Sequence, residues 1–266
     1  MRIRHPGFNV VILVLSSMTV VYIAYPLITI FIFSEPSSKL LDSLTRPEVS
    51  DALVLSLISA TISTLLLSLF GIPLAYFLAR YENFLAKFLF RIIIIIPLVL
   101  PPLATGSLLL GAFGPYSPLV QAFPGIEFTQ SMVGVIIAQT YVASPFMILA
   151  SQVAFESVDE SYEKIARILG KSRVETFFMV LLPLARTGIV IGFIMSWVRS
   201  IGELGATMMM AYNPHTISIQ IFEDNAIGGL RQAVPSIILV ILLSIVAVVT
   251  IFYFTIRKKQ DILKLT

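Results

Sequence analysis

Residues 152–186 read QVAFESVDESYEKIARILGKSRVETFFMVLLPLAR and form the longest charged stretch of an otherwise apolar chain. Five acidic and five basic side chains fall within it, and apolar residues such as Ile165 and Leu169 lie between them at helical spacing. The pattern predicts a short amphipathic helix, a turn at Gly170, and a second helix that ends near Leu182 and Pro183.

Three interpretations of this stretch can be weighed from its residues alone. Gly170-Lys171-Ser172 matches the end of a phosphate-binding Walker A loop, but Ile165 stands where that loop requires its first glycine. The turn around Gly170 also fits a DNA-binding helix-turn-helix, but few basic side chains would face DNA and apolar spans flank the stretch. A solvated helical loop without a partner stays open as the third interpretation.

The chain as a whole is too apolar for a soluble protein. Of its 266 residues 57% are apolar and 12% are charged, against about 45–50% and about 25% in typical soluble domains. It contains no cysteine, which excludes disulfides, thiolate chemistry and cysteine-ligated metal sites. We therefore expect an all-α integral membrane protein with a single transmembrane domain over residues 1–266.

Six stretches are apolar over about the 20 residues that a helix needs to cross a bilayer. They cover residues 10–33, 52–79, 88–113, 131–151, 187–211 and 236–254. The first follows Arg2, Arg4 and His5 as a signal peptide would, but its apolar run exceeds the ~7–15 residues of a signal peptide's apolar region. We expect it to be retained as a span, and the charged stretch to join spans four and five.

The positions of the basic residues predict the orientation of the spans. Fourteen of the 18 Lys and Arg residues lie in the two tails and in the loops after spans two and four. Lys39, Arg46 and Arg231 lie in the other loops, and Arg199 lies within span five. Because short loops rich in Lys and Arg stay in the cytoplasm, we expect both termini and residues 152–186 on that side.

Two spans carry residues that membrane helices usually avoid. The third contains Pro97, Pro101 and Pro102, which remove backbone donors and should kink the helix, either for packing or to line a cavity. In the fifth, helical spacing puts five polar side chains on one face: Ser196, Arg199, Ser200, Glu203 and Thr207. The charged pair among them fits a buried ion pair that joins helices, a pathway or gate, or an arginine that reaches water at the membrane edge.

The charged stretch resembles the EAA loop of ABC importer permeases. The resemblance rests on residues 162–170, YEKIARILG, and on Val180-Leu181-Leu182-Pro183, which follow after nine further residues. Lys164 and Ile165 depart from the family pattern, which has Glu and Ala there. In that family the loop inserts a short helix into a groove on the cytoplasmic ATPase. The resemblance therefore implies coupling roles for Glu163, Ala166, Gly170, Leu182 and Pro183.

Residues 197–207, WVRSIGELGAT, and residues 97–106 resemble permeases for molybdate and tungstate, and sulfate and thiosulfate permeases are the nearest alternative. The resemblance implies two copies of this chain in a prokaryotic cell membrane, two ATPase subunits, and an external oxyanion-binding protein. It also implies a translocation path or gate that includes Ser196, Arg199, Ser200, Glu203, Thr207, Pro101 and Thr105. ATP and Mg would bind on the ATPase, so we expect no catalytic residue, cofactor, metal site or nucleic-acid partner for this chain.

Two other classes of protein stay open at this point. An ion-coupled secondary transporter should carry carboxylates within its spans, and Glu203 is the only clear one. A membrane-anchored regulator would bind DNA or a signalling partner through residues 152–186. Dependence of uptake on a separate ATPase would distinguish an ABC permease from both.

Overall fold

The computed structural model describes residues 6–32, 46–81, 83–123 and 125–263, and in these residues it contains helices and no strand. The elements are α1 (Pro6–Ile32), α3 (Pro47–Arg80), α4 (Phe84–Val99), α5 (Pro102–Phe113), α6 (Pro118–Ala122), α7 (Met132–Glu156), α8 (Ser161–Ile168), α9 (Arg173–Thr176), the π-helical turn η1 (Phe177–Leu181), α10 (Leu182–Ile201), α11 (Gly205–Met210) and α12 (Ile217–Leu263). Six described segments are long and apolar enough to cross a membrane: Val11–Ile32, Pro47–Arg80, Pro102–Ala122, Met132–Glu156, Arg173–Ile201 and Ile217–Phe254. The expected all-α membrane fold with six spans is confirmed.

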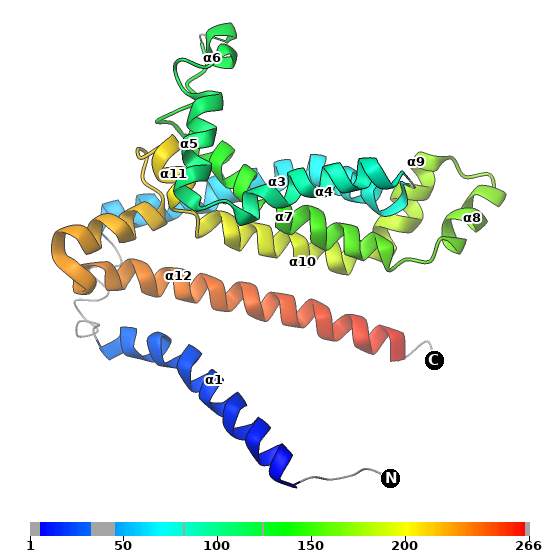
Figure 1. Cartoon of the computed structure of the whole chain (residues 1–266), viewed down its shortest axis with the longest axis horizontal. Coiled ribbons are helices and arrows are strands. Elements are labelled where there is room, and N and C mark those ends of the chain that lie inside the picture. Colours follow the sequence, from blue (N-terminus) through cyan, green and yellow to red (C-terminus); the bar gives the residue numbers. More distant parts are fainter. Residues whose placement is uncertain (1–5, 33–45, 82, 124, 264–266) are drawn as a thin grey trace.

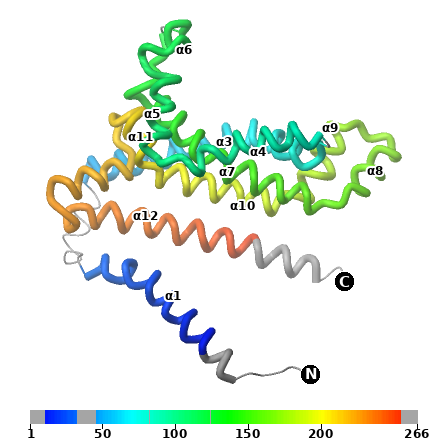
Figure 2. The backbone as a smooth tube through the Cα atoms, viewed as in Figure 1, coloured from blue at the N-terminus to red at the C-terminus, as the bar shows by residue number. Residues whose placement is uncertain are grey.

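Helices α3, α7 and α10 lie side by side and form the centre of the molecule (Figure 1). Fully buried small polar residues on α3, among them Ser59 and Ser63, let this helix approach its neighbours closely. The Ser63 hydroxyl donates to the carbonyl oxygen of Ile136 in α7 at 3.2 Å. Helices α8 and α9 lie at one end of this bundle, and the bend of α12 lies at the opposite end (Figures 1 and 2).

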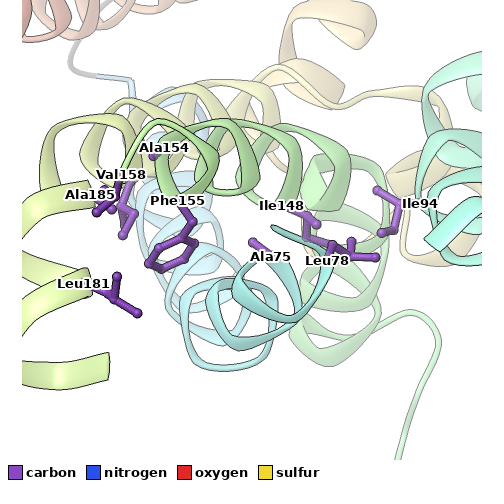
Figure 3. Packing of buried hydrophobic residues seen from close by; sticks show 10 residues of the cluster. Ala75, Leu78, Ile94, Ile148, Ala154, Phe155, Val158, Leu181 and Ala185 are labelled. Atoms are coloured by element: carbon purple, nitrogen blue, oxygen red, sulfur yellow. The ribbon is translucent and has the colours of Figure 1, made fainter. Parts of the chain in front are cut away.

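An apolar cluster fastens the bundle at the end near α8 (Figure 3). It joins Ala75 and Leu78 of α3 to Phe155 of α7 and Leu181 of η1. The ring of Tyr76 extends the cluster, since its centroid lies 5.6 Å from that of Phe155 in an edge-to-face arrangement. At this end α3, α7 and the start of α10 therefore form one packed unit.

The third expected span, residues 88–113, is not one helix. Helix α4 ends at Val99 and α5 begins at Pro102, and Leu100 and Pro101 between them are extended, with ψ of 138° and 139°. Two consecutive prolines cause the break, because each lacks an amide donor and each disfavours a helical conformation for the residue before it. Pro97, by contrast, lies inside α4 and does not end it.

The fifth expected span, residues 187–211, is also broken. Helix α10 ends at Ile201, and α11 begins at Gly205 after three residues outside both helices. Glycines at 202 and 205 weaken a continuous helix, and the Glu203 carboxylate accepts a hydrogen bond from the amide of Ala206 in the new helix. The prediction that Ser196 to Thr207 share one helix face is therefore wrong beyond Ile201.

The second helix of the charged stretch does not end at Leu182 and Pro183. The chain continues from α9 through η1 directly into α10, which begins at Leu182. Pro183 follows the π-helical turn, in which the Leu182 amide donates to the Phe177 carbonyl oxygen five residues before it, and the wider turn accommodates a proline without ending the helix. The first half of the prediction agrees with the structure: α8 is a short helix, and Gly170 turns the chain with a φ of 85°.

The remaining spans differ from expectation mainly in length. Helices α3 and α7 extend past the expected 52–79 and 131–151. The last span begins well before 236, as part of α12, which bends sharply at Gly229, where φ is 68°. Helix α1 covers the first expected span as far as Ile32, and Phe33 lies outside the described residues.

Candidate functional site

Helix α8 has an apolar side that the other described residues leave uncovered. Ile168 and Leu169 are 83% and 76% exposed, and Ile165 beside them is also exposed. Glu163 and Ala166 lie on the opposite side of the helix and are buried. Of the residues expected to couple to an ATPase, these two thus face inward, while neighbouring residues form the exposed surface.

Gly170 ends α8 and reverses the chain. Its φ of 85° lies in the left-handed region, which is costly for residues with a side chain. A Cβ atom at this position would meet no atom within 4 Å, so the backbone conformation, not a lack of space, requires glycine. The amide of Lys171 then donates to the Ala166 carbonyl oxygen at 3.0 Å, as in a glycine-terminated helix.

A buried ion pair fastens α8 to the last turn of α3. Arg80 Nε donates to Glu163 Oε1, and Arg80 Nη2 donates to the carbonyl oxygen of Val158 at 2.8 Å. The Tyr76 hydroxyl lies 3.4 Å from the other carboxylate oxygen of Glu163. The two charged side chains are only 15% and 11% exposed. Since α3 carries Arg80 and Tyr76, these side chains attach α8 to α3.

The segments on either side of α8 are held by local hydrogen bonds. The Ser161 amide donates to the Asp159 carboxylate at 2.7 Å, and this hydrogen bond holds the pKa of Asp159 below its usual value. Ser172 and Glu175 form a reciprocal capping box that begins α9. Leu182 and Pro183 follow η1 as the first residues of α10, with Leu182 half-buried and Pro183 exposed. The charged stretch is thus held at both ends of α8 by local hydrogen bonds, and most of its side chains are exposed.

The two helix breaks meet near the other end of the bundle. We call residues 100–106 and 201–207 the break region. A Cβ atom on Gly205 would lie 2.5 Å from Cβ of Pro102, and one on Gly106 would lie 2.6 Å from Cβ of Met209. Helices α5 and α11 are therefore in backbone contact, which only glycine permits at these positions. Pro101, which precedes α5, is exposed.

Glu203 holds the break region together by two interactions. Its Oε1 accepts from the Ala206 amide at 2.8 Å, and its Oε2 lies 2.6 Å from Nη2 of Arg199 on α10. The Glu203 side chain is 1% exposed and that of Arg199 is 30% exposed. From the connection between the two helices, Glu203 thus contacts the end of α10 through Arg199 and the start of α11 through the Ala206 amide.

The hydroxyl groups expected along a path have two different environments. Ser196 donates to the carbonyl oxygen of Ala143 in α7 at 3.3 Å, so it serves helix packing. Thr105, Ser200 and Thr207 are buried, yet their hydroxyls have no hydrogen-bond partner among the described residues. Buried polar atoms are nearly always partnered in folded proteins, so three such hydroxyls in and beside the break region call for an explanation.

The sequence matches the family model described as "Binding-protein-dependent transport system inner membrane component" over residues 71–260. The chain belongs to this permease family. It is 37% identical to the probable molybdenum ABC transporter permease protein of Haloferax volcanii, over 90% of this chain and 87% of that protein. It is 38% identical to the molybdate/tungstate transport system permease protein of Pyrococcus abyssi, over 83% of this chain and 85% of the relative. Family membership confirms the resemblance seen in the EAA-like loop.

Solved permease structures share the fold. A crystal structure of a bacterial alginate ABC transporter matches with a TM-score of 0.72 at 14% identity, over 94% of this chain and 93% of that one. An inward-facing methionine ABC transporter matches with a TM-score of 0.55 at 16% identity, over 82% and 96% of the two chains. At these identities the likeness concerns the fold alone.

Sequence reasoning missed Arg80 as a partner of the permease's EAA-like loop. Arg80 counted only as one of the basic residues that set orientation, because nothing in its own neighbourhood points to Glu163. The single available signal was an arginine at the end of an apolar span, where snorkelling to water is the ordinary expectation.

Proposed function

We propose that this chain is the transmembrane subunit of an ATP-driven importer for a tetrahedral oxyanion, molybdate or tungstate. The observation that carries the proposal is the identity of 37% and 38%, over most of both chains, to proteins named as permeases for molybdenum and for molybdate and tungstate. The chain would move the anion and would leave ATP hydrolysis to a separate subunit.

Such an importer needs partners on both sides of the membrane. Two cytoplasmic ATPase subunits would bind ATP and Mg, so this chain would hold no cofactor of its own. An external binding protein would deliver the anion, and two copies of this chain would form the translocation unit. Exposed apolar side chains on α1 and α5, such as Tyr22 and Leu103, leave surface for a second copy as well as for lipid.

The exposed side of α8 supports docking of an ATPase. Ile165, Ile168 and Leu169 present an apolar surface outside the expected membrane region, where exposed apolar residues usually mark a partner site. Glu163 and Ala166 would hold the buried side of this helix against the rest of the chain, and the turn at Gly170 would end the exposed apolar surface. Movement of the ATPase would then reach α3 through the pair between Arg80 and Glu163.

The break region supports an anion as cargo. The unpartnered hydroxyls of Thr105, Ser200 and Thr207 can donate to oxyanion oxygens, and donors of this kind hold an anion weakly enough for release. Both carboxylate oxygens of Glu203 are already engaged, by Arg199 and by the Ala206 amide. A carboxylate so occupied is poorly suited to carry a coupling proton or cation, which favours an ATP-driven importer over a secondary transporter.

We place the chain in a prokaryotic plasma membrane with both termini and α8 in the cytoplasm, on the basis of the uneven distribution of basic residues. The chain has no native cysteine, so single cysteines can be labelled without background. An impermeant maleimide should label Tyr116→Cys in intact cells and Lys171→Cys only after the cells are opened; both positions are exposed. Labelling of Lys171→Cys in intact cells would contradict this orientation.

Reconstitution tests the transport function. Liposomes that contain this chain and its ATPase, with the external binding protein added, should accumulate molybdate or tungstate when ATP is supplied. Dissipating ion gradients with ionophores should not stop uptake. Calorimetry on the binding protein identifies the anion. Tight binding of sulfate without binding of molybdate or tungstate would change the assigned substrate to sulfate. Gradient-driven uptake without the ATPase would refute the assignment as an ABC importer.

A further inference from the structure

The first arm of α12, residues 217–228, begins beside the break region. The Ser218 hydroxyl donates at 2.9 Å to the carbonyl oxygen of Ile201, the last residue of α10. The Ile217 amide donates to the Ser56 hydroxyl of α3 at 2.8 Å. Ile217 and Ile201 are buried in the same apolar cluster. The start of this arm is thus fixed to the residue at which α10 stops.

The same arm also holds the segment that follows α11. Glu223 accepts a hydrogen bond from the hydroxyl of Tyr212, and its other oxygen lies 3.2 Å from Nδ1 of His215. Tyr212 and His215 lie in the connection between α11 and α12. The arm therefore contacts the chain on both sides of the segment from Gly202 to α11. It meets Ile201 before this segment, and Tyr212 and His215 after it.

The far end of the arm is fixed by a buried carboxylate. Asp224 is 2% exposed and receives an ion pair from Arg46, before α3, at 2.9 Å. Gln220 of the same arm and Gln232 of the second arm each donate to its Oδ1 at 3.2 Å, and the Ser236 hydroxyl lies 3.5 Å from Oδ2. A carboxylate with several charged and neutral donors is well stabilised even when buried. Asp224 thus joins the two arms of α12 to each other and to the start of α3.

Beyond Asp224 the bend of α12 is exposed. Residues 225–231 all lie open to solvent, and Ile227 is 79% exposed. The bend lies at the opposite end of the molecule from α8 (Figure 1). In the proposed orientation this end faces the outside, where a binding protein would arrive.

We infer that residues 217–228, which we call the lever helix, carry movement from the exposed bend of α12 to the break region. Docking of the external binding protein on the bend would displace the lever helix as a rigid rod, because Asp224 prevents the bend from moving independently. The displacement would reach the end of α10 through Ser218 and the connection after α11 through Glu223. Ser218 and Asp224 are positioning residues in this scheme, which rests on the proposed function.

The test uses the complete transporter in lipid nanodiscs, with the molybdate-loaded binding protein as the probe. ATP hydrolysis is measured with and without that protein, for the unaltered complex and for Ser218→Ala and Asp224→Asn. Basal hydrolysis should be unchanged in Ser218→Ala, while stimulation by the binding protein should fall about fivefold, the effect of one ordinary hydrogen bond. Asp224→Asn should lower stimulation at least as much. The affinity of the binding protein for Ser218→Ala should match that for the unaltered complex, because the bend is intact.

Matched controls are available in the same elements. Ser244 in the second arm of α12 donates only within its own helix, to the Val240 carbonyl oxygen, so Ser244→Ala should keep full stimulation. Asp51 is an exposed carboxylate on α3, so Asp51→Asn should also keep full stimulation by the binding protein. Full stimulation of Ser218→Ala would overturn the lever helix while the transport function stands. Absence of stimulation in the unaltered complex would overturn the proposed function, and the lever with it.

Discussion

Replacing Arg80 with alanine should leave the assembled transporter able to hydrolyse ATP while anion import per ATP falls about tenfold or more. The change removes two donors that α3 offers to this segment, one to Glu163 of α8 and one to the Val158 carbonyl oxygen just before α8. Breaking a buried ion pair from one side costs roughly 3–5 kcal/mol, and about 1.4 kcal/mol of this in the coupling step is enough for a tenfold effect. The measurement is the ratio of anion imported to ATP hydrolysed in liposomes.

The pair between Arg91 and Glu156 provides the matched control. It also joins two helices, α4 and α7, at 3.2 Å, but its side chains are 44% and 41% exposed. Exposed pairs contribute little, so Arg91→Ala should import normally. The exchange Arg80→Glu with Glu163→Arg should recover part of the coupling. An unchanged import ratio in Arg80→Ala would show that α3 is not the route by which α8 acts.

The number of membrane spans and the turn at Gly170 were predictable because their signals are local. A span is a run of apolar residues long enough for the bilayer, and residues 131–151 satisfy that criterion without reference to any other part of the chain. Gly170 follows a short amphipathic stretch, and glycine is the usual residue for a helix-ending turn with positive φ. The structure gives both features as expected.

The kink expected from the prolines of the third span is a complete break at Leu100, and the break at Gly202 was not predicted, because hydropathy registers neither interruption. Residues 88–113 and 187–211 are apolar on both sides of their breaks, so the mean hydropathy over a window of residues indicates one continuous span in each case. The double proline at 101 and 102 and the glycines at 202 and 205 were visible, but glycine and proline also occur inside membrane helices. These residues weaken each helix locally, whereas the contact of Gly205 with Pro102, which brings the two breaks together, is a tertiary feature.

Long-range ion pairs were beyond the reach of a single sequence for a similar reason. Arg80 and Glu163 are 83 residues apart, and Arg46 and Asp224 are 178 apart. Arg199 and Glu203 could be paired from their spacing alone, but the spacing suggested one helix, whereas Glu203 lies in the connection after α10. The residues that fix α8 and the bend of α12 are therefore charged residues whose partners only the fold supplies.

The pair in the break region should show an asymmetry between its two members. Arg199→Leu should destabilise the protein more than Glu203→Gln, because it leaves a carboxylate that is 1% exposed with a single amide donor. Glu203→Gln leaves the arginine, whose side chain is 30% exposed and can turn toward water. An unpaired charge at a fully buried site costs about 3–5 kcal/mol, so we expect Arg199→Leu to approach this range and Glu203→Gln to stay below it.

The double variant Arg199→Leu with Glu203→Gln separates pairing from an independent role of Glu203. If the carboxylate serves to hold α10 and α11 together, the neutral pair should be more stable than Arg199→Leu alone, and thermal unfolding should give a coupling energy well above zero. Uptake should recover in parallel, because the side-chain oxygen of the introduced glutamine can still accept from the Ala206 amide. A secondary transporter that used Glu203 to carry protons would instead lose uptake in every variant without the carboxylate, whatever stands at position 199. Equal loss of uptake in Glu203→Gln and in the double variant, with zero coupling in stability, would therefore refute the bridging role of the pair.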